Sequence, residues 1–220
     1  MRILAIGDPH GNLKKIRKIP KKGIDLILLT GDLGKADLAR KMSFANVERK
    51  RKGLPELEET SAQAKKAHME IHNSTINLLR YLSKYAPIYT IQGNVGIPTK
   101  TQVKEDRKKH RIKVPCTKSQ IEKMKKVHII KNRLKVIEGV RIGFLEMFTD
   151  ISWIKEFKPS EYKKKMKKAK KETSKARRVL HKFGSDLDVL VCHQPPLGIL
   201  DKVSGKYGAP KQWRGKHAGS

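Results

Sequence analysis

The chain has 220 residues, a length that suits one domain or one domain with an insertion. Its 51 Lys and Arg residues outnumber its 21 Asp and Glu residues, which gives a formal net charge of +30. This charge attracts polyanions such as nucleic acids, nucleotides and acidic membranes, although a lysine-rich surface without such a partner carries the same charge. No apolar stretch approaches the roughly 20 residues of a membrane span, and two cysteines cannot form a disulfide framework. We therefore expect a basic cytoplasmic protein outside the membrane.

The first part of the chain predicts a βαβ unit followed by further helices. Residues 2–8, RILAIGD, and 24–32, IDLILLTGD, are two buried strands that end in Gly-Asp, and residues 13–23 contain a short helix. Two strands separated by a helix form a parallel pair. Residues 35–85 are mainly helical and charged, with a break at 52–56, and we interpret them as a helical insertion.

The middle of the chain predicts short strands. Residues 87–94, PIYTIQGN, form a third buried strand, whereas the basic residues 97–126 indicate a loop with one helix near the end. Residues 127–147 are a run of short strands, and Glu138 and Gly139 suit a hairpin turn.

The last part contains a basic helix and a fourth buried strand. Residues 160–183 form a helix with 11 Lys and Arg residues against two Glu. Its charges form either a solvated face or a strip that contacts phosphates, and the first interpretation is favoured because few aromatic residues accompany them. Residues 187–196, LDVLVCHQPP, form the strand, and Cys192 within it suits a buried free thiol of a reducing compartment.

Polar residues follow each of the four buried strands. They are Asp8 with His10, Asp32, Asn94 and His193. Ligands of an open α/β sheet bind at the carboxyl ends of its strands, so these side chains can converge. Asp-x-His also places two side chains on the same side of an extended segment. Oxygen and imidazole ligands suit Mn, Fe or Zn, and a shared carboxylate fits the metal pair of phosphatases and nucleases.

Four segments, GDPHG, GDLG, GN and CHQPP, occur in this order within residues 1–196. Together they resemble the successive motifs of the calcineurin-like metallophosphoesterase superfamily. The resemblance implies an α/β fold, a four-layered α/β/β/α sandwich of two packed sheets with the site at the sheet edge. Residues 1–220 would then form a single metallophosphoesterase domain, with residues 35–85 as a helical basic insertion.

The resemblance also implies a role for each matching residue. Asp8 and His10 would bind one divalent metal ion, Asp32 would bridge two, and Asn94 and His193 would bind the second, the ions being Mn, Fe or Zn. Asn94 would also orient the phosphate. A hydroxide that bridges the metals would attack phosphorus in line, which makes the protein a hydrolase of phosphomonoesters or phosphodiesters.

Two departures from the family pattern concern the end of the site. Val95 stands where many members have a histidine that assists phosphate charge neutralisation or protonates the leaving group. The closing Gly-His-x-His motif is not found, and GKHAGS at 215–220 resembles the stretch that precedes it in archaeal-type members. We therefore expect a chain truncated before that motif, with His217 as a candidate catalytic substitute.

Several alternatives stay open at this point. Asp8 and Asp32 could cap helices. His68 and His72, four residues apart, suit a surface position or packing of the insertion better than a metal site, because the Glu of an H-E-x-x-H motif is out of place. The whole chain could be a basic nucleic-acid-binding module on a decayed phosphoesterase fold, or an inactive piece of an enzyme. The substrate is open among nucleotides, cyclic nucleotides, nucleic acids and phosphoproteins, and the charge favours phosphodiesters of nucleotides or nucleic acids.

Overall fold

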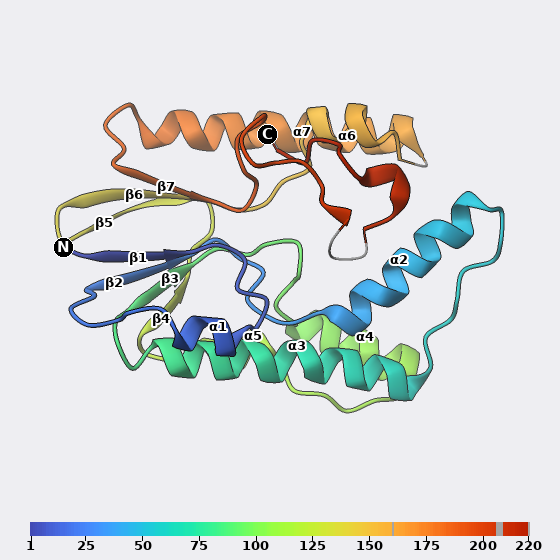
Figure 1. The fold of residues 1–220 in the computed structure, drawn as a ribbon, viewed down its shortest axis with the longest axis horizontal. Helices are drawn as coiled ribbons and strands as arrows, with labels where there is room; N and C mark the ends of the chain where they lie inside the picture. Colours follow the sequence, from blue (N-terminus) through green and yellow to red (C-terminus); the bar gives the residue numbers. More distant parts are fainter. Residues whose placement is uncertain (160, 206–208, 220) are drawn as a thin grey trace. The chain divides into compact units, whose positions relative to one another are not determined.

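The computed structural model describes residues 1–159, 161–205 and 209–219. It divides into two compact units, Met1–Ile130 and Lys131–Ser220. Each unit contains one β-sheet with helices (Figure 1). Parallel strands and helices in one chain confirm the predicted α/β class. The four-layered stacking and the single domain with an insertion at 35–85 stay predictions.

The sheet of the first unit is fully parallel and has the order β1-β2-β3-β4. Its strands are β1 (Ile3–Ile6), β2 (Leu26–Leu29), β3 (Ile88–Thr90) and β4 (Val127–Ile129). Ile6 pairs with Leu29, and Leu29 pairs with Thr90, so β1, β2 and β3 end in register. The loops that follow these three strands therefore start side by side at one edge of the sheet, where polar residues can meet.

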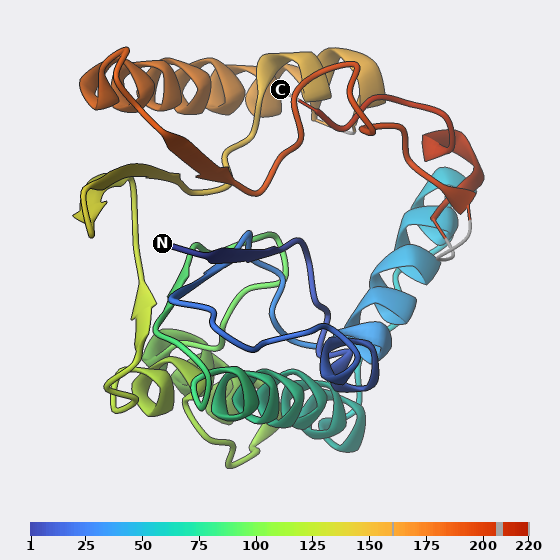
Figure 2. The same ribbon diagram turned by 60° about the vertical axis from the view of Figure 1, so that its left-hand side comes forward.

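Helices cover this sheet, and α3 provides most of the packing. The unit contains α1 (Leu13–Arg17), α2 (Asp37–Arg51), α3 (Ser61–Leu82), α4 (Lys100–His110) and α5 (Thr117–Ile121). Figures 1 and 2 both show α1 and α3 on the same face of the sheet. Ile76, Leu79 and Leu82 of α3 pack with Ile27 and Ile88 of the strands in one buried core. A capping box of Thr60 and Gln63 starts α3 where the sequence predicts the helical region to resume.

Helix α4 corrects the prediction of a loop with a single helix over residues 97–126. Thr99 and Gln102 form a capping box at its start, and the helix buries none of its residues. A helix without a buried face shows no apolar periodicity, which is the pattern used to predict helices. The capping box was therefore the only strong sequence signal for α4.

The second unit contains a three-stranded sheet of order β5-β6-β7. Strands β5 (Arg133–Ile137) and β6 (Val140–Leu145) form an antiparallel hairpin. Glu138 and Gly139 join them with φ angles of 49° and 82°, which confirms the predicted hairpin turn. β7 (Val189–Cys192) pairs with β6 in parallel.

Two helices, α6 (Ile151–Phe157) and α7 (Tyr162–Phe183), accompany this sheet, and Lys211–Trp213 form a 3-10 helix, η2. A Cβ atom at Gly143 would lie 2.8 Å from the Phe183 ring, so the glycine of β6 lets the end of α7 approach the sheet closely.

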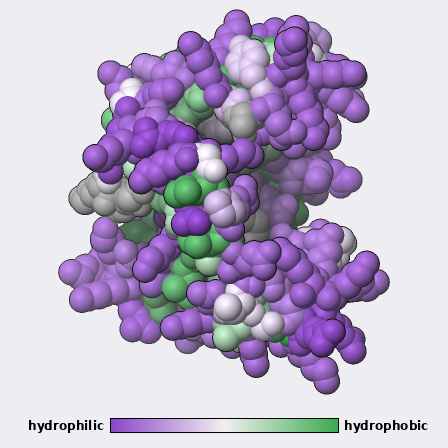
Figure 3. Space-filling model, turned by 90° about the vertical axis from the view of Figure 1, so that its right-hand side faces the viewer, coloured by the Kyte–Doolittle hydropathy of each residue, from purple (hydrophilic) through white to green (hydrophobic). Residues whose placement is uncertain are grey.

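Hydrophilic side chains cover most of the face that Figure 3 shows, as expected from the net charge of +30. Within the residues described, no helix has both the length and the apolar character needed to cross a membrane.

Candidate metal centre

The segment after β1 is a tight turn. β1 ends at Ile6, and Asp8 and His10 have φ angles of 37° and 43°. The expectation that Asp-x-His lies in an extended segment is therefore wrong. Backbone hydrogen bonds fix the turn instead, because His10 N donates to Asp32 O at 2.9 Å and Gly11 N donates to Leu33 O at 2.8 Å. The turn after β1 is thus held directly against the turn after β2.

Asp32 has the same unusual backbone as the first two predicted ligands. Its φ angle is 42°, and Gly31 before it has a φ of 106°. Left-handed backbone at a residue other than glycine costs on the order of 1–3 kcal/mol and persists mainly at functional sites. Three predicted ligands, Asp8, His10 and Asp32, share this conformation, and they lie in two neighbouring turns at one edge of the sheet.

Thr30 at the end of β2 holds the Asp8 side chain. The Thr30 hydroxyl donates to Asp8 Oδ1 at 3.1 Å and accepts the Asp8 backbone N–H at 3.2 Å. Thr30 is not among the residues predicted from the sequence. Its position two residues before Asp32 in TGD was the available signal, because the ends of parallel neighbouring strands lie side by side.

The Asp32 carboxylate is the buried centre of the cluster, with 2% of its surface exposed. Its Oδ2 lies 3.8 Å from His10 Nε2, and its Oδ1 accepts the backbone N–H of Val95 at 2.6 Å. The second contact places Asn94, the residue before Val95, next to the turn after β2. The first unit therefore brings together Asp8, His10, Asp32 and the segment of Asn94.

The donor geometry fits a divalent metal ion. Two donors that each lie about 2.1 Å from one ion cannot be more than about 4.2 Å apart, and His10 Nε2 and Asp32 Oδ2 satisfy this limit. One oxygen of Asp8 and one of Asp32 lie within 4.8 Å of each other, an upper bound that is wider than this limit. His10 Nδ1 is buried without a hydrogen-bond partner among the described residues. Carboxylates and an imidazole suit Mn, Fe or Zn.

The caps of the neighbouring helices argue against a merely structural role for the two aspartates. Asn12 caps α1, since its side chain accepts the N–H of Lys15, and Ala36 precedes α2 without a side-chain cap. Neither Asp8 nor Asp32 is the N-cap of these helices. The helix-cap alternative is therefore wrong for both residues.

Helix α3 fixes the loop that carries Asp32. A Cβ atom at Gly34 would lie 2.4 Å from Thr75 Oγ1, so the last glycine of GDLG allows a close approach to the helix. Ser74 Oγ accepts the backbone N–H of Lys35 at 2.8 Å, and Glu70 accepts that of Leu38 at 3.0 Å. Sequence reasoning did not find these supports, because their partners lie 32 to 39 residues away.

Lys35 itself joins the same arrangement from the exposed side. Its ammonium lies 3.2 Å from Asp37 and 3.4 Å from Glu70. Hydrogen bonds to Asp37 and then to Glu70 raise the pKa of Lys35. Glu70 of α3 thus contacts the loop through its ion pair with Lys35 and the start of α2 through its hydrogen bond with Leu38 N.

His193 follows β7 in the second unit, and its neighbour Gln194 fixes that strand end. The Gln194 amide accepts the Phe148 N–H at 3.1 Å and donates to Phe148 O at 2.8 Å. Cys192 is a free thiol, as predicted, and burial raises its pKa. That His193 shares one metal site with the predicted ligands of the first unit stays a prediction.

His217 is held within the second unit by Asp201. Its Nδ1 lies 2.9 Å from Asp201 Oδ1, and it pairs with Lys202 in an isolated β-bridge. Burial acts to raise the pKa of Asp201, but hydrogen bonds from Gly198 and His217 lower it overall. The use of His217 in place of the family's closing histidines stays a prediction.

His68 and His72 are buried inside the first unit, which agrees with packing and corrects the alternative of a surface position. His68 contacts Asp106 Oδ2 at 3.0 Å and Pro115 O at 2.8 Å. His72 Nδ1 lies 2.8 Å from the Thr117 hydroxyl. The two rings tie α3 to α4 and α5.

Comparisons with known proteins identify the class of this site. The sequence model of the calcineurin-like phosphoesterases matches residues 1–215. The chain therefore belongs to the calcineurin-like phosphoesterase family, whose members are metal-dependent phosphoesterases. This membership favours the enzyme interpretation over a decayed binding module.

A comparison of this chain with solved structures also finds a protein of similar fold. One crystal structure matches with a TM-score of 0.58 and 10% sequence identity, over 99% of this chain and 76% of that chain. At this identity the likeness shows the fold alone. A search of curated proteins gave no match.

Proposed function

We propose that the protein hydrolyses phosphoesters with two divalent metal ions, held by Asp8, His10, Asp32, Asn94 and His193. The observation that carries the proposal is the convergence of Asp8, His10 and Asp32 in strained turns at one sheet edge. Membership of the calcineurin-like phosphoesterase family supports it. In this proposal Asp8 and His10 hold one ion, Asp32 is shared, and Asn94 and His193 hold the other.

Each first-unit residue has a defined task in this mechanism. A bound metal pair supplies an activated water as nucleophile and neutralises charge on the phosphoryl oxygens. Asp32 Oδ1 accepts the N–H of Val95 and has a second lone pair, which could bind a metal ion. Thr30 orients Asp8. The side-chain amide of Asn94 donates a hydrogen bond to the phosphate.

Val95 leaves the site without a proton donor at the position where many family members have a histidine. A valine side chain has no proton to transfer, so this position cannot protonate a leaving group. We therefore expect esters of acidic phenols to react faster than alkyl esters, whose leaving groups need a proton.

We further propose nucleotide or nucleic-acid phosphodiesters as the substrate class. The net charge of +30 attracts polyanions over a distance set by the ionic strength. The supporting local feature is α7, on which most basic side chains are exposed. Such a substrate predicts that kcat/KM falls as salt concentration rises.

The test is hydrolysis of bis(4-nitrophenyl) phosphate and 4-nitrophenyl phosphate with Mn²⁺. We expect Asp32→Asn to lower kcat by about 10³-fold, because a shared carboxylate is lost from both ions. Asp37→Asn is the matched control, since Asp37 is an exposed carboxylate of the following helix that forms an ion pair with Lys35. Equal rates for Asp32→Asn and the wild type, or no metal-dependent rate at all, would contradict the proposal.

A further inference from the structure

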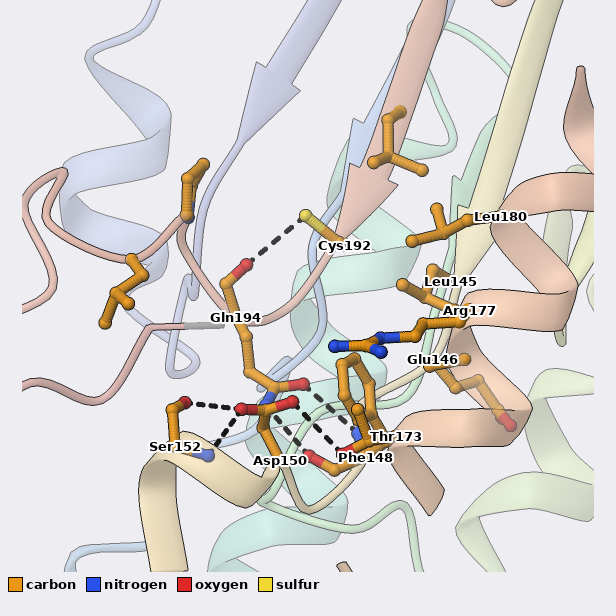
Figure 4. Close-up of a pocket in the computed structure, with 14 residues that line it drawn as sticks. Leu145, Glu146, Phe148, Asp150, Ser152, Thr173, Arg177, Leu180, Cys192 and Gln194 are labelled. Carbon is orange, nitrogen blue, oxygen red and sulfur yellow. Dashed lines mark hydrogen bonds between the residues drawn. The ribbon is translucent and has the colours of Figure 1, made fainter. Parts of the chain in front are cut away.

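A pocket of about 350 Å³ lies in the second unit, between α7 and the sheet. Its walls come from the ends of β6 and β7, the segments that follow them, and one side of α7 (Figure 4). This volume is at the lower end of the range for small-molecule sites. Cys192 and Gln194 line it, whereas His193 between them does not. The pocket is therefore separate from the surface that carries His193.

The pocket is mainly apolar. Its apolar walls are Leu145, Phe148, Leu180, Leu190 and Leu197. Leu180, Leu190 and Leu197 remain 37%, 42% and 56% exposed. Covering these side chains with an apolar group would remove their surface from water, at about 25 cal/mol per Å².

Most polar groups of the pocket already have partners inside the protein. Asp150 accepts hydrogen bonds from Ser152 N at 2.7 Å, from the Ser152 hydroxyl, and from the Thr173 hydroxyl at 3.1 Å. Burial acts to raise the pKa of Asp150, but these hydrogen bonds lower it overall. Gln194 is bonded to the backbone of Phe148.

The remaining acid of the pocket is Glu146. Its carboxylate lies 3.2 Å from Lys131 Nζ, and Figure 4 shows it pointing away from Gln194. Like Asp150, it is engaged by the protein itself.

Arg177 differs from the other charged residues of the pocket, which are engaged by the protein itself. Figure 4 shows its guanidinium reaching from α7 toward the middle of the pocket. Among the described residues it has neither a hydrogen bond nor an ion pair. A guanidinium presents a planar fork of donors that matches a carboxylate or phosphate. The pocket thus offers a ligand one free cation beside an apolar wall.

We propose that this pocket binds a small amphipathic anion, with its carboxylate or phosphate on Arg177 and its apolar body against the leucines. This function does not depend on phosphoester hydrolysis. A cationic ligand fits less well, because the carboxylates of Asp150 and Glu146 are engaged by the protein.

Cys192 can report occupancy, because this residue lines the pocket and its thiol donates a hydrogen bond to Gln194 O at 3.3 Å, beside the pocket wall (Figure 4). The protein is alkylated in the presence of octanoate, octyl phosphate or octanol, and mass spectrometry measures how fast Cys192 is modified. Cys116 in the first unit is the internal reference. We expect octanoate or octyl phosphate to protect Cys192 saturably and to leave Cys116 unchanged. Octanol, which has the same apolar body without the charge, should need at least about tenfold higher concentration.

Arg177→Gln tests the anchor, and Arg178→Gln is its matched control. Both arginines are exposed on α7, but only Arg177 lines the pocket. We expect Arg177→Gln to weaken protection by the anions at least about tenfold, and Arg178→Gln to change it less than twofold. Equal effects of the two variants, equal protection by octanol, or no saturable protection would each overturn the proposal.

Discussion

Helices α3 and α7 both have 22 residues, yet they contribute to the protein in different ways. α3 buries large apolar side chains, and Leu78, Leu79 and Leu82 have no exposed surface. α7 buries mainly small residues and keeps most of its charged residues in solvent. α3 supports the candidate metal centre through Glu70 and Ser74, whereas α7 forms a basic surface and one wall of a pocket. The comparison shows that helix length and periodicity do not reveal which helix supports a site.

The largest expected difference concerns stability. Leu79→Ala in α3 should lower the free energy of unfolding by about 2–5 kcal/mol, because it leaves a cavity in the core. Leu180→Ala in α7 should cost less than about 1 kcal/mol, since this side chain is 37% exposed. Urea denaturation of both variants measures the difference, and equal losses would contradict the comparison.

Gly34→Ala tests the contact between α3 and the loop of Asp32. The new methyl group would lie 2.4 Å from Thr75 Oγ1 and 2.9 Å from Ile71 O, so we expect a loss of about 1–3 kcal/mol and weaker metal binding. Gly96→Ala is the control, because its nearest contact would be Gln102 Nε2 at 3.9 Å. Denaturation and metal titration of both variants provide the measurement. A stable Gly34→Ala variant with unchanged metal binding would refute the role of this contact.

The two helices should also differ in their response to pH. Burial, followed by the nearby charges of His68 and Arg80, lowers the pKa of His72 from its usual 6.5. The unfolded chain then binds a proton more readily than the folded one, so His72 contributes stability above pH 6.5 that is lost as the pH falls below it.

Glu172 of α7 acts in a lower pH range. Burial acts to raise its pKa, but hydrogen bonds from Thr149 and then the charge of Lys168 lower it overall from 4.5, so its contribution is lost only below that pH. Urea denaturation from pH 7.5 to 4 should show a decline below pH 6.5 that flattens in His72→Gln and persists in Glu172→Gln. A decline unchanged in His72→Gln would refute this assignment.

The smallest expected effect on stability concerns the charges of α7. Replacing Lys163 and Lys167, both exposed, with Gln should change the free energy of unfolding by less than about 0.5 kcal/mol. If α7 contacts phosphates, the same pair should reduce the slope of log K against log salt for single-stranded DNA binding by about 1.4 units. The matched pair on α3, Lys65→Gln with Lys66→Gln, should leave that slope unchanged. Equal salt dependence for the α7 and α3 double variants would contradict the idea that α7 contacts phosphates.

The sequence predicted the fold class and the positions of the buried strands, because apolar runs and Gly-Asp turns are local signals, but the strands predicted to end at residues 8, 32 and 94 end at Ile6, Leu29 and Thr90. β1, β2 and β3 lie where apolar runs end before Asp8, Asp32 and Asn94. It did not predict the left-handed backbone of Asp8 and His10, because hydrogen bonds to the residues around Asp32 create that turn. The supports from Thr30 and Ser74 were missed for the same reason, since they come from distant parts of the chain.

Direct measurement of bound metal tests the central claim, that Asp8, His10 and Asp32 form a metal centre. Purified protein is equilibrated with Mn²⁺, and bound metal is counted by elemental analysis for the wild type and for His10→Ala, Asp32→Asn and His181→Gln. The account predicts two ions in the wild type and in His181→Gln, whose histidine is exposed on α7, and fewer in the other two variants. A wild type without bound metal, or His10→Ala and Asp32→Asn variants with as much metal as the wild type, would contradict it.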